Sequence, residues 1–311
     1  MNGLVSISPG VALEPIEKER GFSPVRYFAA SAITGGIAYE ALPRCRTVAM
    51  CSFAVSSWCL LSSAVVVANR MAGSSPLGNL IHRIHAVVTD LNSLFYAVCH
   101  APLSFFKSYH GATGNLQGRP ILLVNGYLCL GSHWHYLRKE LAKAGLGPIY
   151  TMNVGTGKSN RAYAEDVGER VEEIQKETGR NDLILIGHSK GGLVANYYAM
   201  HLASNSSVRI TDVINIGAPF KGTPLAKLGL GFDALEMRLD SKFHVDLRKK
   251  MKDHPEIRFY YIASSADYYV SLLSAIVGDD SSKQLVVNDL GHLSIIFSSR
   301  IASRICTWLK P

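Results

Sequence analysis

The chain has 311 residues, of which 48% are hydrophobic and 18% are charged, and its net charge is +8. This length suffices for one large α/β domain and a further segment, and the shortage of charged residues before position 115 indicates that the two parts differ. No arginine-rich arm, RNA-recognition motif or basic patch interleaved with aromatic residues accompanies the positive charge, so we expect no nucleic-acid partner.

Residues 1–115 form a hydrophobic segment that the sequence predicts to be mainly helical. Residues 47–69 carry no charge between Arg46 and Arg70. As a helix this run extends about 34 Å, enough to cross a hydrocarbon core of about 30 Å. An earlier apolar run over 27–39 is broken by Gly35 and Gly36. The stretch 80–106 carries apolar residues at helical spacing and is predicted to be an amphipathic helix.

These features predict that the chain is membrane-associated through its amino-terminal segment, with 47–69 as a candidate transmembrane helix. The alternative is a helical hairpin that packs on the second domain. Three glutamates within the first 20 residues do not fit the basic start of a secretory signal, so a cleaved signal peptide is not expected.

A glycine-rich stretch, 111–118, marks the boundary of a second domain over 116–311. In this domain short apolar runs alternate with helical patterns. The predicted strands are 121–124, 149–154, 183–186, 213–216, 257–263 and 284–287, and the predicted helices are 132–144, 162–178, 193–202 and 293–309. Such alternation predicts a mostly parallel central sheet with helices on both faces and a site at the carboxyl ends of the strands. Residues 221–256 would form a small cap that lines a pocket, covers it as a lid, or only packs on the domain.

The most informative motif is Gly-His-Ser-Lys-Gly at 187–191, which follows one predicted strand and precedes a predicted helix. Ser189 on so tight a strand-to-helix turn is held in a strained backbone conformation that exposes its hydroxyl. This arrangement is the nucleophile elbow of serine hydrolases. The alternative is a glycine-rich turn that only lets the strand and the helix pack closely.

A serine hydroxyl needs a base to remove its proton, and the base needs an acid that orients it. In α/β-hydrolases the chain order is serine, then acid, then histidine. His292 lies just after the last predicted strand and before the last helix, where the base is expected. Three other histidines follow Ser189, but one is too far along a helix and two fall in the insertion between strands: His201, His244 and His254.

The acid should follow a late strand. Asp267 lies four residues beyond the strand that ends at residue 263 and is the predicted acid, while Asp289 is the alternative. The oxyanion hole needs two backbone N–H donors. The residue after the nucleophile, Lys190, supplies one, and Tyr127, in the loop after the first strand of the domain, supplies the other.

We expect neither a metal nor a cofactor. His133 and His135 form an H-x-H pair, but no third ligand accompanies them, and a surface role at a helix start is predicted. Six irregularly spaced cysteines predict neither a zinc site nor a disulfide framework. No glycine-rich nucleotide-binding motif occurs.

Together these residues resemble the α/β-hydrolase lipases, and the pattern is similar to bacterial triacylglycerol lipases and esterases that often carry hydrophobic amino-terminal helices. The similarity runs from about Pro120 to the carboxyl terminus, on segments 120–127, 187–192, 217–226 and 291–294. Two positions depart from the pattern: Asn125 stands where histidine is usual, and Lys190 where methionine is common. A cation beside the nucleophile could alter substrate preference. The resemblance implies the same five site residues: Ser189, Asp267, His292, Tyr127 and Lys190.

The sequence therefore predicts a membrane-associated α/β-hydrolase that cleaves carboxylic esters through an acyl-enzyme. Lipid esters are the main expected substrates. An acyltransferase or a phospholipase with the same triad remains an alternative, as does a non-catalytic, membrane-anchored binding protein with this fold.

Overall fold

The computed structural model describes residues 12–13, 46–101, 105, 110–251, 253–277 and 283–310; within these, the side chains of 12–13, 46–53 and 56 are not described. The apolar run over 27–39 lies outside the described residues.

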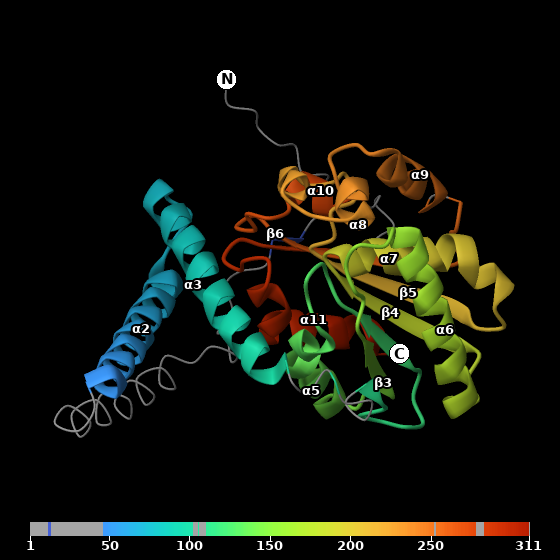
Figure 1. Cartoon of the computed structure of the whole chain (residues 1–311), viewed down its shortest axis with the longest axis horizontal. Helices are drawn as coiled ribbons and strands as arrows, with labels where there is room; N and C mark the ends of the chain where they lie inside the picture. The colour runs from blue at the N-terminus through green and yellow to red at the C-terminus, as the bar shows by residue number, and fades with distance from the viewer. Residues whose placement is uncertain are drawn as a thin grey trace.

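A parallel sheet of seven strands forms the centre of the molecule, in the order β1-β7-β6-β5-β4-β2-β3 (Figure 1). The mostly parallel sheet predicted from the alternating pattern is therefore confirmed. The first strand comes from the amino-terminal segment and pairs with the last. The strands are β1 (Ala12–Leu13), β2 (Ile121–Val124), β3 (Ile149–Met152), β4 (Asp182–His188), β5 (Arg209–Ile216), β6 (Arg258–Ser264) and β7 (Lys283–Val287).

The strands are apolar on both faces because helices cover both faces. Alternate residues of one strand point to opposite sides, so that Leu122 joins one core cluster and Leu123 the other. The first cluster packs under α6 (Asn160–Thr178) and α7 (Lys190–Tyr197), and the second under α5 (His135–Lys143) and α11 (Ser299–Leu309). This explains why continuous apolar runs predicted the strands well.

Two of the predicted helices are interrupted. The predicted helix over 193–202 belongs to α7 and a π-helical turn, η3 (Tyr198–Leu202). The predicted helix over 293–309 divides into a 3-10 turn, η6 (Ser294–Phe297), and α11, because the Ser298 hydroxyl accepts a hydrogen bond from the Ile301 N–H and caps a new helix. The other 3-10 turns outside the cap are η2 (Gly131–Trp134) and η4 (Ala203–Asn205).

The strand order reverses at β2. The chain runs from β2 outward to β3 and then returns to place β4 on the other side of β2, with Val124 beside Gly187. In open parallel sheets such a reversal leaves a crevice at the carboxyl ends of the two strands. The loops that follow β2 and β4 therefore meet at the edge where a site is expected.

The segment between β5 and β6 includes residues 221–256, which the sequence predicts to be a cap. It contains η5 (Pro224–Lys227), α8 (Phe232–Glu236) and α9 (Lys242–Met251), and α10 (Leu272–Ala275) follows β6. In Figure 1, α8, α9 and α10 gather on one side of the sheet, away from α5.

The helices α2 (Arg46–Met71) and α3 (Pro76–His100) form a hairpin beside the α/β body, with α3 between α2 and the body (Figure 1). The Trp58 indole N–H donates to Asn92 at 2.8 Å and joins the two helices. The described residues thus adopt the alternative arrangement, a hairpin packed on the second domain. Within the described part of the chain, no helix is long and apolar enough to cross a membrane. The predicted span 47–69 lies within α2, where the side chains of 47–53 and 56 are not described, and its crossing of a membrane stays a prediction.

The orientation of α3 differs from that of an ordinary surface helix. Its buried residues are mostly polar or small, and they include His82, His85, Thr89, Asp90 and Ser93. Its apolar stripe faces outward instead. The exposed residues of this stripe are Leu77, Leu80, Ile84, Val87, Leu91, Leu94, Phe95 and Val98.

Candidate active site

Ser189 occupies the turn between β4 and α7 with φ of 54° and ψ of −126°. A positive φ is costly for a residue with a side chain, and such strain is concentrated at functional sites. Two hydrogen bonds hold the turn: the Ser189 N–H donates to Ile216 at 2.9 Å, and the Ser189 carbonyl accepts from Gly192 at 3.0 Å. A Cβ on Gly191 would lie 2.1 Å from the Val124 carbonyl oxygen, so only glycine lets this turn approach β2. The geometry is that of a nucleophile elbow.

His292 and Asp267 form a hydrogen-bonded pair behind the elbow. The Nδ1 of His292 lies 2.7 Å from Oδ2 of Asp267, and both side chains are almost fully buried. The other carboxylate oxygen of Asp267 accepts the N–H groups of Tyr269 and Val270 at 2.8 and 2.9 Å. These bonds fix the carboxylate and leave Nε2 of His292 as the free ring nitrogen of the pair.

The electrostatics of this pair favour a protonated imidazole. Burial works to lower the pKa of His292, but the charge and hydrogen bond of Asp267, with a further contribution from the charge of Asp90, outweigh it and raise the pKa above 6.5. The imidazole can therefore accept a proton within the buried site and hold it.

His188, which the motif contains but our sequence reasoning did not assign, supports the base from the elbow itself. Its Nε2 lies 2.8 Å from the carbonyl oxygen of His292, and the two rings lie 4.8 Å apart. Burial, and then the nearby imidazole of His292, lower the pKa of His188 well below 6.5, so it stays neutral and donates its Nε2–H. Tyr269 stacks on His292 at 5.1 Å.

Asn125 braces the loop after β2. Its Oδ1 accepts the Val154 N–H at 2.7 Å, while its Nδ2 donates to the carbonyls of Val154 and Cys129. Asn125, which stands where histidine is usual, thus supplies both a donor and an acceptor that hold the loop carrying Tyr127. The Tyr127 hydroxyl in turn bonds the main chain of Leu230 in the cap, donating at 2.8 Å and accepting at 2.9 Å.

A cation beside the nucleophile could alter substrate preference, but the side chain of Lys190 is held inside the protein. It is fully buried and forms an ion pair with Asp233 of α8 at 2.8 Å. Its ammonium lies over the ring of Tyr163 at 4.1 Å and donates to the Gly155 carbonyl at 2.5 Å. Burial lowers the pKa of Lys190, and the bond to Asp233 opposes this. Lys190 therefore ties the nucleophile helix to the cap.

The remaining candidates lie elsewhere. Asp289 bonds Arg300 and Asn69 rather than His292. His201 stacks on Tyr197 outside the site, and His244 and His254 belong to the cap region. His133 is buried and its Nδ1 contacts Leu130, so the predicted surface role was wrong for this residue. Among the described residues no cluster of three or more potential ligands could hold a metal ion.

A largely apolar cavity of about 560 Å³ lies in front of these groups. Ser189, His292 and Tyr269 line it from the loops, and α3, the cap and the segment after β2 supply most of the rest. This volume falls in the usual range for a small-molecule site. The aliphatic lining residues from α3 and the cap include Leu94, Ala97, Val98, Leu225, Leu228 and Met237.

Comparisons with known proteins agree with the fold. A family model described as a PGAP1-like alpha/beta domain matches residues 148–289. A triacylglycerol lipase of Pseudomonas fragi is 29% identical over 119 residues, covering 36% of this chain and 39% of that protein. A triacylglycerol lipase of Vibrio cholerae is 30% identical over 120 residues, covering 36% of each chain. The mature lipase BlEst2 of Bacillus licheniformis has a TM-score of 0.53 at 18% identity, covering 63% of this chain and 93% of that chain.

The parallel sheet and the likeness to the lipase BlEst2 show an α/β-hydrolase fold, and the chain is similar to triacylglycerol lipases over 36% of its length. The chain spans about two fifths or less of the length of the curated relatives it matches.

Proposed function

We propose that this chain is a serine hydrolase that cleaves carboxylic esters, with lipid esters as its substrates. One observation carries the proposal: a serine on a strained elbow and a histidine bonded to a buried aspartate line one apolar cavity. The similarity to triacylglycerol lipases supports the substrate class. The strained φ of Ser189 argues against a glycine-rich packing turn, because packing alone does not require a non-glycine residue there.

In this mechanism Ser189 attacks the ester carbonyl while Nε2 of His292 takes the hydroxyl proton. Asp267 keeps the imidazole oriented and stabilises its charged form. The N–H groups of Tyr127 and Lys190 stabilise the oxyanion of the tetrahedral intermediate. His292 then protonates the leaving alcohol, and a water molecule activated by the same base releases the acid from Ser189.

The apolar lining favours an aliphatic acyl chain. Burial of each methylene stabilises binding by about 0.8 kcal/mol, so kcat/KM should rise with acyl length until the cavity is filled. A panel of esters of increasing acyl length, with water and simple alcohols as competing acceptors, separates hydrolysis from acyl transfer.

A fluorophosphonate probe tests the nucleophile. We expect labelling at Ser189 and turnover of short esters by the purified chain, and we expect the Ser189→Ala variant to lose both, with kcat falling by about 10⁶. Labelling that persists in the alanine variant would falsify the assignment.

The pH profile tests the base. His292 must be neutral to accept a proton, and its pKa is raised above 6.5, so kcat/KM should fall as the pH drops through that raised value. Asp267→Asn removes the main contribution that raises the pKa, so the acidic limb should move below 6.5 while kcat falls by about 10⁴. An acidic limb that stays in place would contradict this pairing.

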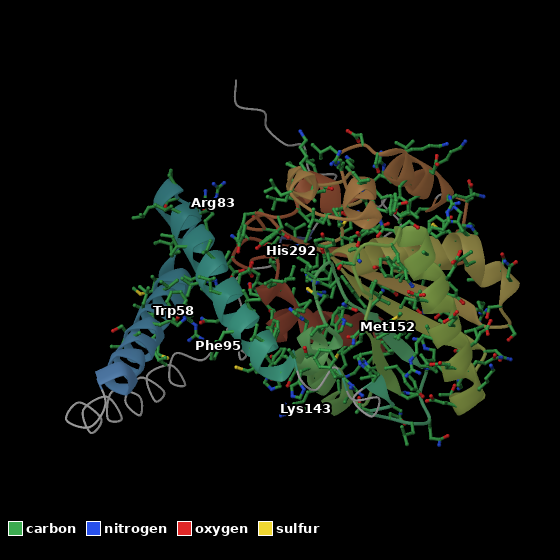
Figure 2. The ribbon with its side chains drawn as sticks, viewed as in Figure 1. Trp58, Arg83, Phe95, Lys143, Met152 and His292 are labelled. Atoms are coloured by element: carbon green, nitrogen blue, oxygen red, sulfur yellow. The ribbon has the colours of Figure 1, made fainter. Side chains whose placement is uncertain are left out.

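We further propose that the enzyme contacts a lipid surface through the apolar stripe of α3. Figure 2 shows Phe95 on the hairpin, where 72% of this residue is exposed. Leu94 and Val98 belong both to the stripe and to the cavity lining, so the exposed apolar surface leads directly into the cavity. Exposed apolar surface of this extent is typical of an interaction site.

Vesicle flotation tests this contact. The double variant Leu91→Asp with Phe95→Asp places two charges on the stripe and should lower the vesicle-bound fraction about tenfold or more. Val245→Asp, which changes a comparably exposed residue of α9, is the matched control and should bind as the wild type does. Equal binding by the double variant and the wild type would contradict the proposal.

A further inference from the structure

Asp90 is the only acidic residue of α3, and it is buried against the α/β body, 2% exposed. One of its carboxylate oxygens accepts the N–H groups of Leu293 and Ser294 at 3.0 and 2.7 Å. These residues directly follow His292 in the chain. The hairpin thus bonds the main chain of the loop that carries the candidate base, and Figure 2 shows His292 on the side of the body that faces α3.

The other oxygen of Asp90 reaches the loop that carries the candidate acid. It accepts the hydroxyl of Tyr268 at 3.0 Å, and Tyr268 directly follows Asp267. The ring of Tyr268 lies 4.8 Å from that of Tyr269, which stacks on His292. One carboxylate therefore joins the acid loop to the base loop.

The base loop is shaped to admit this carboxylate. A Cβ on Gly291 would lie 2.4 to 2.5 Å from the three carboxyl atoms of Asp90. Any side chain at position 291 would displace Asp90 or the loop. Glycine at this position is therefore explained by the close approach of α3.

In each of these three hydrogen bonds the Asp90 carboxylate is the acceptor. Burial raises the pKa of Asp90, and the hydrogen bonds from Ser294 and Tyr268 and the charge of His292 oppose this. The same bonds favour the ionised carboxylate, whose charge contributes to the raised pKa of His292.

We propose that Asp90 is a positioning residue of the active site, which fixes the loops of Asp267 and His292 relative to each other and stabilises the imidazolium form of His292. The hairpin of α2 and α3 thereby completes the site of the hydrolase. This inference rests on the proposed function, in which His292 is the base.

Two substitutions separate position from charge. Asp90→Asn keeps an oxygen for the N–H groups of Leu293 and Ser294 but removes the charge. We expect kcat to fall severalfold and the acidic limb of kcat/KM to move about half a pH unit lower. Asp90→Leu removes both contributions. We expect kcat to fall about tenfold or more with KM changed less than twofold, because a small displacement of a catalytic group is costly.

Asn69→Ala is the matched control. Asn69 bonds His82 of α3 and Asp289 at the start of the base loop, but it makes no hydrogen bond to Asp90 or to the groups that Asp90 holds. This variant should loosen the hairpin and leave kcat and the acidic limb unchanged. If kcat fell equally in Asp90→Asn and Asn69→Ala, or if both Asp90 variants kept the wild-type kcat and acidic limb, the proposal would be overturned.

A measurement that does not depend on ester turnover tests the proposal even if the Asp90→Leu variant does not fold or the chain proves inactive. In the Ser189→Ala protein the ring of His292 is titrated by NMR, with and without Asp90→Asn. A lower pKa of His292 in the double variant supports the role of Asp90, and an unchanged pKa overturns it. Absence of ester turnover and of fluorophosphonate labelling in the wild type would instead count against the proposed function.

Discussion

The helices α3 and α6 both pack on the α/β body, but they bury opposite kinds of residue. Helix α6 buries Tyr163, Val167, Val171 and Ile174 and turns its charged residues to solvent. Helix α3 buries histidines, hydroxyls and one carboxylate and turns its apolar stripe outward. Apolar burial is not directional, whereas buried polar groups require partners at defined positions. The contacts of α6 therefore stabilise the fold, and those of α3 define where its groups lie relative to the active-site loops.

The largest expected difference between these helices is in their response to the same substitution. Val171→Asp in α6 places an unpaired charge in a fully buried position and should abolish soluble, folded protein. Leu91→Asp in α3, where the leucine is 47% exposed, should change the free energy of unfolding by less than about 0.5 kcal/mol. Expression, circular dichroism and urea unfolding measure both. Comparable destabilisation by the two variants would mean that the stripe of α3 is buried in solution.

A second contrast concerns two buried carboxylates. Burial works to raise the pKa of Asp212, but hydrogen bonds and charges, chiefly of Arg258, outweigh it and lower the pKa below 3.8. The stabilisation by Asp212 is therefore present above its unfolded pKa and is lost as the pH falls through the lower, folded pKa. The pKa of Asp90 is raised by burial, so its charge opposes folding above pH 3.8.

Asp212→Asn should thus lower the free energy of unfolding at pH 7 by about 3 kcal/mol. Asp90→Asn should leave that free energy within about 0.5 kcal/mol of the wild type or raise it, even though it lowers kcat. Urea unfolding at pH 7 and at pH 4 measures both values. An equal loss of stability in the two variants would show that Asp90 acts as a structural ion pair does.

The smallest expected effect concerns how stably the hairpin of α2 and α3 is held on the body. Asn69→Ala removes two buried hydrogen bonds of the hairpin, to His82 and to Asp289, and should lower the stability of the hairpin by about 1 kcal/mol. Amide hydrogen exchange should become faster in α2 and α3 and stay unchanged in α6. Faster exchange throughout the sheet would show that the hairpin and the body unfold as one unit.

Much of the α/β body was predictable because its signals are local. A strand buried on both faces is continuously apolar, and each predicted strand of the second domain overlaps a strand of the structure. The candidate site residues followed from one short motif and from the loops that come after late strands. These loops meet because parallel strands end at the same edge of the sheet.

The sequence pattern does not say which face of α3 points inward. Periodicity over 80–106 predicts two faces, but the polar one is buried because its partners, Leu293 and Ser294, lie some 200 residues further along the chain. The ion-pair partner of Lys190 could not be predicted for the same reason, since Asp233 lies 43 residues away in the sequence. The sequence did carry one signal for the role of Asp90: it is the only carboxylate in the predicted helix over 80–106.

The paired hydrogen bonds between the Tyr127 hydroxyl and the main chain of Leu230 have a mechanical consequence. The residue that we propose as an oxyanion donor is fastened through its own ring to the tip of the cap. If the cap swings outward, it must either break both bonds or pull that donor away from the carbonyl oxygen. Opening of the cavity by an outward movement of the cap would therefore disturb the stabilisation of the reacting ester.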